Sequence, residues 1–168
     1  MVKSSNKIAV CSRSFSNNLV LKKELLKNYK NVIFNKSKIL CGNELILFLK
    51  DADKAIIGLE KIDKKIIDSL PKLKVISKFG VGLNNIDIEY LKYRKIRLGW
   101  ESGVNKRSVS ELTLCLILNS IRKISFNQSD LHNKIWKQTI GSDLTNSTIG
   151  IIGCGNVGQD LIKLLKPF

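Results

Sequence analysis

Short apolar runs alternate along the first hundred residues with segments whose apolar positions recur every three or four residues. The runs are rich in isoleucine and valine, which favour strands. They lie at 8–11, 32–34, 55–57 and 75–77, with a further candidate at 96–98. We interpret each run as a buried strand, because parallel strands covered on both faces are almost continuously apolar.

The segments between these runs have the spacing of amphipathic helices. Asn18 is expected to cap one helix, and 43–49 forms another. A third follows from Ile62 to Leu70, where Pro71 ends it, and a fourth begins at Asp87. Alternating strands and helices predict an α/β fold, a parallel sheet with helices on both faces.

A different pattern begins after the glycine-containing loop at 99–104. Ser108 and Glu111 have the spacing of a capping box, which predicts a helix that begins there and ends near Ile121. That helix is apolar on nearly every side from 112 to 118, so we expect it to be buried in a core or between two domains. Residues 125–147 are polar and are interpreted as a loop with a short helix near 130–136.

The strongest local motif lies near the end of the sequence. Thr148–Ile152 is predicted to be a strand, and the residues after it, Gly153-Cys154-Gly155-Asn156-Val157-Gly158, match G-x-G-x-x-G before a helical segment. In such a motif the first glycine permits a tight turn, the second lets a pyrophosphate approach the backbone, and the third allows close packing. The alternative is a glycine-rich connection without a ligand.

Composition narrows the class of protein. The 168 residues are 43% hydrophobic and 26% charged, as in globular proteins. The longest apolar stretch is too short to span a bilayer, and the first seven residues lack the apolar segment of a signal peptide, so we expect a cytoplasmic protein. Cys11, Cys41, Cys115 and Cys154 contain no CxxC pair, which predicts no metal site and four buried or half-buried thiols without disulfides.

The net charge of +15 raises the question of nucleic acid as a partner. The 29 basic residues are mostly lysine, with only five arginines, and they are spread along the chain without a cluster. Grooves that recognise phosphates and guanines favour arginine, whose planar fork makes paired contacts. We therefore interpret the charge as a solvated surface and rank nucleic-acid binding as unlikely.

Three blocks of sequence together resemble the D-isomer-specific 2-hydroxyacid dehydrogenases, particularly their phosphoglycerate dehydrogenase-like members. They are 73–87 (LKVISKFGVGLNNID), 103–112 (GVNKRSVSEL) and the glycine motif with the segment that follows it. The resemblance implies a flavodoxin-like substrate domain over residues 1–104. It further implies the start of a Rossmann NAD-binding domain over 105–168, truncated after its first strand-helix unit.

The resemblance also implies roles for particular residues. The backbone N–H groups of Val81 and Gly82 would hold the substrate carboxylate, and Asn105 would face the substrate; the alternative for 80–82 is merely a tight turn between strand and helix. The pyrophosphate of NAD would be lined by Gly153, Gly155, Asn156, Val157 and Gly158. NADP is not excluded. The acidic residue that recognises the ribose hydroxyls is expected roughly 20 residues after the glycines, and the sequence ends at Phe168, before that position.

Some residues depart from the pattern of the family. The catalytic arginine, glutamate and histidine follow the glycine motif in family members and have no counterpart here, so no catalytic residue is assigned. His132 matches no family position and is interpreted as a solvated loop residue. Glu60 breaks the basic pattern of phosphate-handling members beside Lys61, and Trp100 replaces a usually smaller residue, which leaves the substrate open.

The sequence thus predicts an NAD-dependent oxidoreductase that acts on the CH–OH group of a small D-2-hydroxy acid, or on the corresponding 2-oxo acid. This chain alone is expected to be an incomplete and inactive half, and the full-length form a homodimer. One alternative is a non-catalytic truncated or split subunit that pairs with another chain. A lesser alternative is non-specific binding of nucleic acid through the positive charge.

Overall fold

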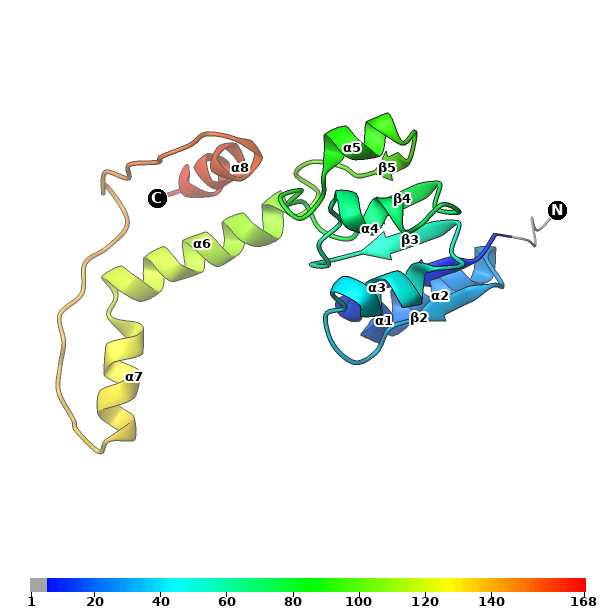
Figure 1. Cartoon of the computed structure of the whole chain (residues 1–168). Coiled ribbons are helices and arrows are strands. Elements are labelled where there is room, and N and C mark those ends of the chain that lie inside the picture. The colour runs from blue at the N-terminus through cyan, green and yellow to red at the C-terminus, as the bar shows by residue number, and fades with distance from the viewer. Residues whose placement is uncertain (1–5) are drawn as a thin grey trace. The chain divides into compact units, whose positions relative to one another are not determined.

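The computed structural model describes residues 6–168, which form two compact units (Figure 1). The first unit ends at Glu101, and the second spans Ser102–Phe168. Residues 1–5, part of the segment on which the expectation of no signal peptide rests, lie outside the described residues. The division of the whole protein into a substrate domain and an NAD-binding domain stays a prediction.

The first unit is built on a five-stranded sheet in which all neighbouring strands are parallel. The strands are β1 (Ile8–Val10), β2 (Val32–Phe34), β3 (Lys54–Ile57), β4 (Val75–Lys78) and β5 (Arg97–Gly99). Their order across the sheet is β2-β1-β3-β4-β5, the order of flavodoxin-like folds. The predicted α/β class and parallel sheet are confirmed.

Five helices connect these strands. They are α1 (Arg13–Asn17), α2 (Leu19–Asn28), α3 (Gly42–Leu49), α4 (Lys64–Asp68) and α5 (Ile88–Tyr93). Asn18 caps α2 as predicted, because its side-chain oxygen accepts from the N–H groups of Val20 and Leu21 at 3.0 and 3.1 Å.

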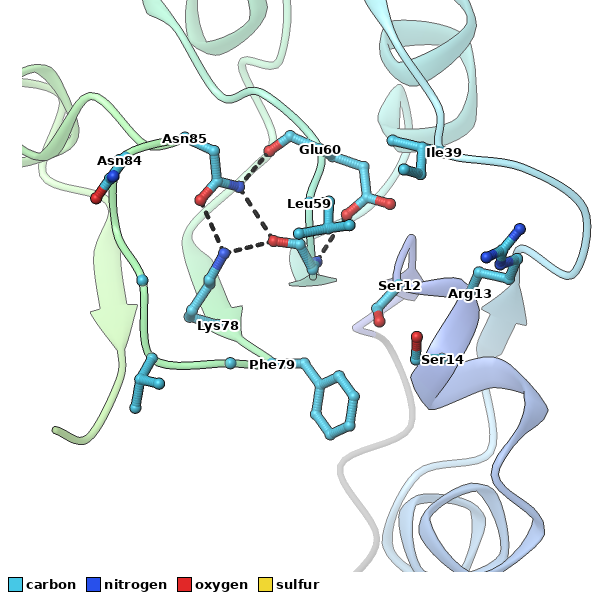
Figure 2. Close-up of a pocket in the computed structure, with 14 residues that line it drawn as sticks. Ser12, Arg13, Ser14, Ile39, Leu59, Glu60, Lys78, Phe79, Asn84 and Asn85 are labelled. Atoms are coloured by element: carbon cyan, nitrogen blue, oxygen red, sulfur yellow. Dashed lines mark hydrogen bonds between the residues drawn. The ribbon is translucent and has the colours of Figure 1, made fainter. Parts of the chain in front are cut away.

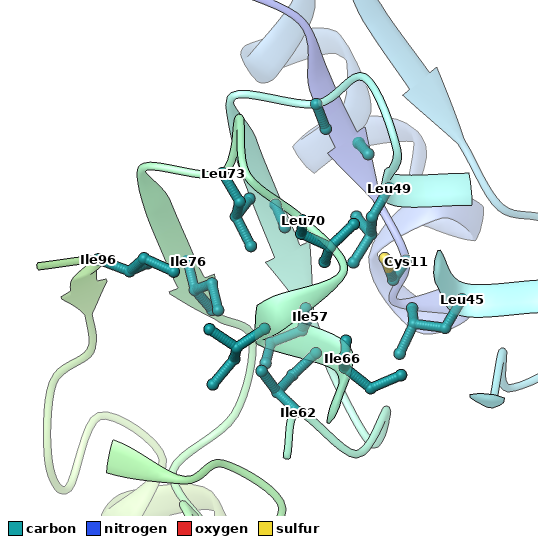
Figure 3. Close-up of a cluster of buried hydrophobic side chains, with 14 of the residues drawn as sticks. Cys11, Leu45, Leu49, Ile57, Ile62, Ile66, Leu70, Leu73, Ile76 and Ile96 are labelled. Atoms are coloured by element: carbon teal, nitrogen blue, oxygen red, sulfur yellow. The ribbon is translucent and has the colours of Figure 1, made fainter. Parts of the chain in front are cut away.

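The hydrophobic core of this unit lies between the sheet and helices α3, α4 and α5 (Figure 3). Alternate strand residues such as Ile57 and Ile76 face this core, where Leu45, Leu49 and Ile67 from the helices meet them with no exposed surface. The core holds the strand ends in place, so the loops that follow the strands have fixed starting points.

The second unit is helical. It contains α6 (Lys106–Ile121), α7 (Ile124–His132) and α8 (Asn156–Leu165). Helix α6 packs along α8, and Ser110 is fully buried at their contact. Its hydroxyl donates to the carbonyl oxygen of either Lys106 or Val157, which lie 2.8 and 3.1 Å away.

The predicted strand at 148–152 is wrong within the described chain. The segment pairs with no other strand there, and Ile152 is fully exposed. A strand exists only where a neighbour takes up its backbone N–H and carbonyl groups, and all five described strands belong to the first unit.

The predicted capping box at Ser108 is also wrong. Helix α6 begins two residues earlier, at Lys106, because Gly103 with φ +72° turns the chain into the helix and Asn105 becomes its N-cap. Ser108 and Glu111 therefore lie inside the helix, where Ser108 is the third helical residue and cannot act as its N-cap.

Helix α7 also differs from the prediction, since it begins at Ile124 and ends at His132 rather than lying near 130–136. The apolar residues of this segment follow a helical spacing only weakly, so the first residue of the helix could not be predicted. In the structure Asn119 provides a local signal, because its side-chain oxygen accepts from the N–H of Ser125 at 3.0 Å. His132 is therefore helical, and it is exposed.

Two expectations about burial are wrong. The apolar helix α6 is not enclosed within the described chain, since Leu112 and Leu116 are more than half exposed. Only Cys11 is buried among the four free cysteines; the others are exposed. In residues 6–168, no helix combines the length and apolarity needed to span a membrane.

Candidate functional site

A cavity of about 520 Å³ opens in the first unit where β1, β3 and β4 end (Figure 2). In open α/β sheets, ligands bind at the carboxyl ends of strands, at the point where strand order reverses. Here that point lies between β1 and β3, and residues after both strands line the cavity. The lining residues are Ser12, Arg13, Ser14, Ile39, Gly58, Leu59, Glu60, Lys78, Phe79, Gly80, Val81, Gly82, Asn84 and Asn85.

A polar cluster ties the loop after β3 to the loop after β4. The Lys78 ammonium donates to the Gly58 carbonyl oxygen and, at 2.8 Å, to the side-chain oxygen of Asn85. The Asn85 amide donates in turn to the carbonyl oxygens of Gly58 at 3.1 Å and Glu60 at 2.6 Å (Figure 2). Lys78 precedes the 79–84 turn and Asn85 follows it, so the residues at both ends of that turn donate hydrogen bonds to the Gly58 carbonyl oxygen.

Glu60 is a buried carboxylate beside this cluster. Its side chain is 1% exposed, and one of its oxygens accepts from the Gly58 N–H at 2.7 Å. Burial lowers the pKa of Lys78, an effect that the nearby Glu60 charge partly opposes. Burial, assisted by the charge of Glu60, also raises the pKa of the Cys11 thiol. Cys11 is thus held as an inert thiol within the hydrophobic core.

The 79–84 turn carries the two predicted carboxylate-binding residues, Val81 and Gly82, and both line the cavity. Gly80 has φ +127°, a conformation that only glycine adopts without strain. Within residues 6–168 the backbone N–H groups of Val81 and Gly82 donate to no protein acceptor. They are therefore available to an anion. The Val81 carbonyl, by contrast, accepts from the indole N–H of Trp100 at 2.9 Å.

The third predicted substrate residue, Asn105, belongs to the second unit. It is the N-cap of α6, and its side chain makes no capping hydrogen bond. The structure therefore brings Val81 and Gly82 together in one cavity and places Asn105 with the residues of the glycine motif.

The glycine motif forms a turn that leads into α8. Gly153 has φ +87°, and a Cβ on Gly158 would lie 2.7 Å from the Gly153 carbonyl oxygen, so turn and helix need glycine at both positions. Gly155 has φ −80°, and a Cβ there would meet nothing within 4 Å. Neither conformation nor packing explains that glycine. Open space beside the free N–H groups of a helix N-terminus fits a bound pyrophosphate.

Two further contacts fasten this turn to the start of α6. The Asn156 amide donates to the Ser102 hydroxyl at 2.9 Å, and Arg107 pairs with Asp160 at 3.1 Å. The Asp160 side chain is 7% exposed and its second oxygen has no partner in the described chain, whereas Arg107 is half exposed. The segment that bears Asn105 and the turn that bears Gly155 are thus held as one piece.

Sequence reasoning missed the roles of Lys78 and Asn85 in this site. Their positions at the end of a strand and after a glycine pair were a usable signal, because polar side chains there lie at the carboxyl edge of the sheet. Ser12, Arg13 and Ser14 follow β1 in the same way.

Comparison with known proteins decides the family. Residues 10–162 match the family model described as the catalytic domain of D-isomer-specific 2-hydroxyacid dehydrogenase. The chain belongs to this family. The match covers both units, from β1 to the middle of α8.

Individual members of the D-2-hydroxyacid dehydrogenase family are similar over most of this chain. The D-3-phosphoglycerate dehydrogenase of Methanocaldococcus jannaschii is 35% identical over 77% of the chain and 25% of its own length. The glyoxylate reductase/hydroxypyruvate reductase of Mus musculus is 31% identical over 71% of the chain and 40% of its own length. The chain therefore spans less than half of these relatives.

Solved structures are similar over nearly the whole chain. An NAD⁺-bound 3-phosphoglycerate dehydrogenase of Entamoeba histolytica has a TM-score of 0.76 and 32% identity, covering 98% of this chain and 51% of that one. The TT0316 protein of Thermus thermophilus has a TM-score of 0.83 and 27% identity over 95% of this chain.

Proposed function

We propose that this chain is part of an NAD-dependent oxidoreductase that acts on the CH–OH group of a small D-2-hydroxy acid, in the manner of phosphoglycerate dehydrogenases. The observation that carries this proposal is the match of residues 10–162 to the dehydrogenase family model, with Gly155 at the start of α8, where a Cβ would meet nothing in the described chain and a ligand has room. Family membership and the NAD⁺-bound relative support NAD as that ligand, with NADP as the variant.

The chain's own residues would then act in two places. The backbone N–H groups of Val81 and Gly82 bind the substrate carboxylate and orient the carbon that reacts, while Asn105 faces the substrate. The residues around the cofactor pyrophosphate are Gly153, Gly155, Asn156, Val157 and Gly158. NAD, when bound, accepts a hydride from the substrate carbon.

Residues 1–168 alone are proposed to bind without turning over substrate. The reaction needs a group that takes the hydroxyl proton as the hydride leaves. The one histidine, His132, is exposed on α7 and lines neither the substrate cavity nor the glycine turn.

The test is an assay of NADH absorbance with D- and L-glycerate, on the protein at the length found in its source cells and on the 168-residue chain. If the intact mass of the protein from cells exceeds that of this chain, we expect that protein to reduce NAD with D-glycerate and not with L-glycerate. We expect no reaction from the 168-residue chain. NADH formation by that chain, or an L preference, would contradict the proposal.

Self-association is the second part of the proposal. Leu112 and Leu116 on α6 and Phe126 on α7 are all more than half exposed. A run of exposed apolar side chains of this kind marks an interaction surface. We assign it to a homodimer of the full-length protein; pairing with a separate chain is the alternative.

A further inference from the structure

Trp100 lies directly after β5, outside the lining of the substrate cavity, and its indole N–H donates to the Val81 carbonyl oxygen at 2.9 Å. We propose that Trp100 is a positioning residue, which aims the Gly82 N–H at the substrate carboxylate. This inference rests on the proposed function, in which Val81 and Gly82 bind that carboxylate.

The geometry of one peptide bond carries the argument. The Val81 carbonyl and the Gly82 N–H belong to the same planar trans peptide group, so they point in opposite directions. A hydrogen bond that fixes the carbonyl therefore fixes the direction of the N–H. The indole N–H is a donor only, so it holds the carbonyl in one orientation.

The turn needs such a restraint because its backbone is otherwise free to rotate. Gly80 and Gly82 flank Val81, and a Cβ on Gly82 would meet nothing within 4 Å. Lys78 and Asn85 fix only the two ends of the turn, through the Gly58 carbonyl. Within residues 6–168, Trp100 provides the side-chain hydrogen bond to the middle of the turn.

Trp100 thus acts on the cavity from outside, through the main chain. Its side chain is 42% exposed, too open for a role as a core residue. The departure from the family pattern at this position has a structural counterpart, the indole N–H that reaches the Val81 carbonyl oxygen.

The experiment follows the Gly82 backbone amide by NMR in the ¹⁵N-labelled chain, with glycolate as the probe. Trp100→Phe keeps an aromatic ring and removes the donor, and Trp100→His restores a ring N–H. The matched control is Trp136→Phe, at the chain's other tryptophan, which is 90% exposed.

We expect glycolate to shift the Gly82 signal in the wild-type chain. In Trp100→Phe the affinity should fall by about 2- to 10-fold, the effect of losing one neutral hydrogen bond, and the order parameter of the Gly82 amide should fall too. Trp100→His should lie between this variant and the wild type, and Trp136→Phe should match the wild type.

Two results would overturn the inference and are distinguishable. Equal glycolate affinity and equal Gly82 order in the wild type and Trp100→Phe would show that the indole positions nothing, while the substrate assignment stands. No response of wild-type Gly82 to glycolate would overturn the substrate assignment and the inference together.

Discussion

Lys78 shows how one side chain can join the two loops that bound a cavity. Its ammonium group lies half-buried between the Gly58 carbonyl and Asn85, near the buried carboxylate of Glu60. Removing the charged form from water costs free energy, which these oxygen partners offset in part. The result is a rigid junction between the two loops that bound the cavity.

Replacing Lys78 by methionine should therefore destabilise the first unit. The lost hydrogen bonds leave the Gly58 carbonyl with Asn85 alone, and we expect the free energy of unfolding to fall by about 1–2 kcal/mol. Urea unfolding measures this change. Lys74→Met is the control, because Lys74 is 71% exposed and its ion pair with Asp53 contributes little. Equal stability of the two variants would contradict the role given to Lys78.

The pH dependence of stability gives a second test at the same residue. The lowered pKa of Lys78 means that the folded chain binds fewer protons than the unfolded chain between that pKa and the usual lysine value. Stability rises with pH wherever the unfolded state binds more protons. The contribution of Lys78 should therefore rise with pH through this alkaline window and be absent from Lys78→Met. If the free energy of unfolding of the wild type relative to Lys78→Met falls as the pH rises, the pKa of Lys78 is raised and the account is contradicted.

At the scale of elements, the pair of helices α6 and α8 is fixed by a few specific contacts rather than by a large core. Arg107 and Asp160 form the ion pair, and the fully buried Ser110 lies beside the Val157 carbonyl. Breaking one partner of a buried pair leaves an uncompensated charge, which costs more than the pair itself contributes.

Arg107→Met should accordingly lower the free energy of unfolding of the second unit by about 1–3 kcal/mol, since Asp160 is buried and Arg107 is half exposed. Asp160→Asn in the same chain should recover part of the loss by removing the unpaired charge. Arg122→Met is the matched control, because Arg122 and Asp143 are both exposed and should contribute close to nothing. Equal effects at the two arginines, in thermal or urea unfolding, would contradict this account.

Elements of the first unit were predictable because their signals are local. Runs such as 55–57 and 75–77 are short and rich in isoleucine and valine, so composition alone indicates the strands, and Asn18 caps its helix through its own neighbours. The errors occur where distant residues decide. Strand 148–152 needs a neighbour to pair with, and the turn at Gly103 that sets the start of α6 lies against the side chain of Asn156 on α8.

The residues of the candidate site also differ in whether their sequence signals are local. The glycine motif and the 80–82 turn are contiguous and could be found in the sequence. The positions of Lys78 and Asn85 near the end of a strand could also be read from the sequence, but their hydrogen bonds could not be predicted, because the cluster joins two loops that approach each other only after the sheet has formed.

At the scale of the whole molecule, the two units differ in how fully they bury apolar surface. The first has a closed core, whereas α6 and α7 of the second expose leucine, isoleucine and phenylalanine side chains. An exposed apolar surface of this kind drives association in water.

We therefore expect the chain to self-associate, and Leu116→Lys to weaken that association by about tenfold or more, as expected for a charge placed in an apolar contact. Sedimentation equilibrium measures the dissociation constant. Leu19→Lys is the control, since Leu19 on α2 is 79% exposed but lies in the first unit. A monomeric wild-type chain, or equal effects of the two variants, would contradict the assignment of this surface.

The net charge of +15 also belongs to the whole molecule. We expect retention on heparin that is lost at modest salt and competition by DNA that is independent of sequence, because scattered lysines bind polyanions only through counterion release. Chromatography over a salt gradient tests this. Retention that resists high salt, or preference for one DNA sequence, would instead indicate a dedicated nucleic-acid site.

The most direct test of the central claim is a calorimetric titration of NAD into the wild-type chain and two matched variants. Gly155→Val fills the open space at the start of α8, and Gly150→Val adds the same side chain where a Cβ also meets nothing within 4 Å. We predict saturable binding to the wild type and to Gly150→Val, and loss of binding in Gly155→Val with unchanged stability. Binding of NAD to Gly155→Val as to the wild type, or no binding to any of them, would contradict the assignment of the glycine turn to the cofactor.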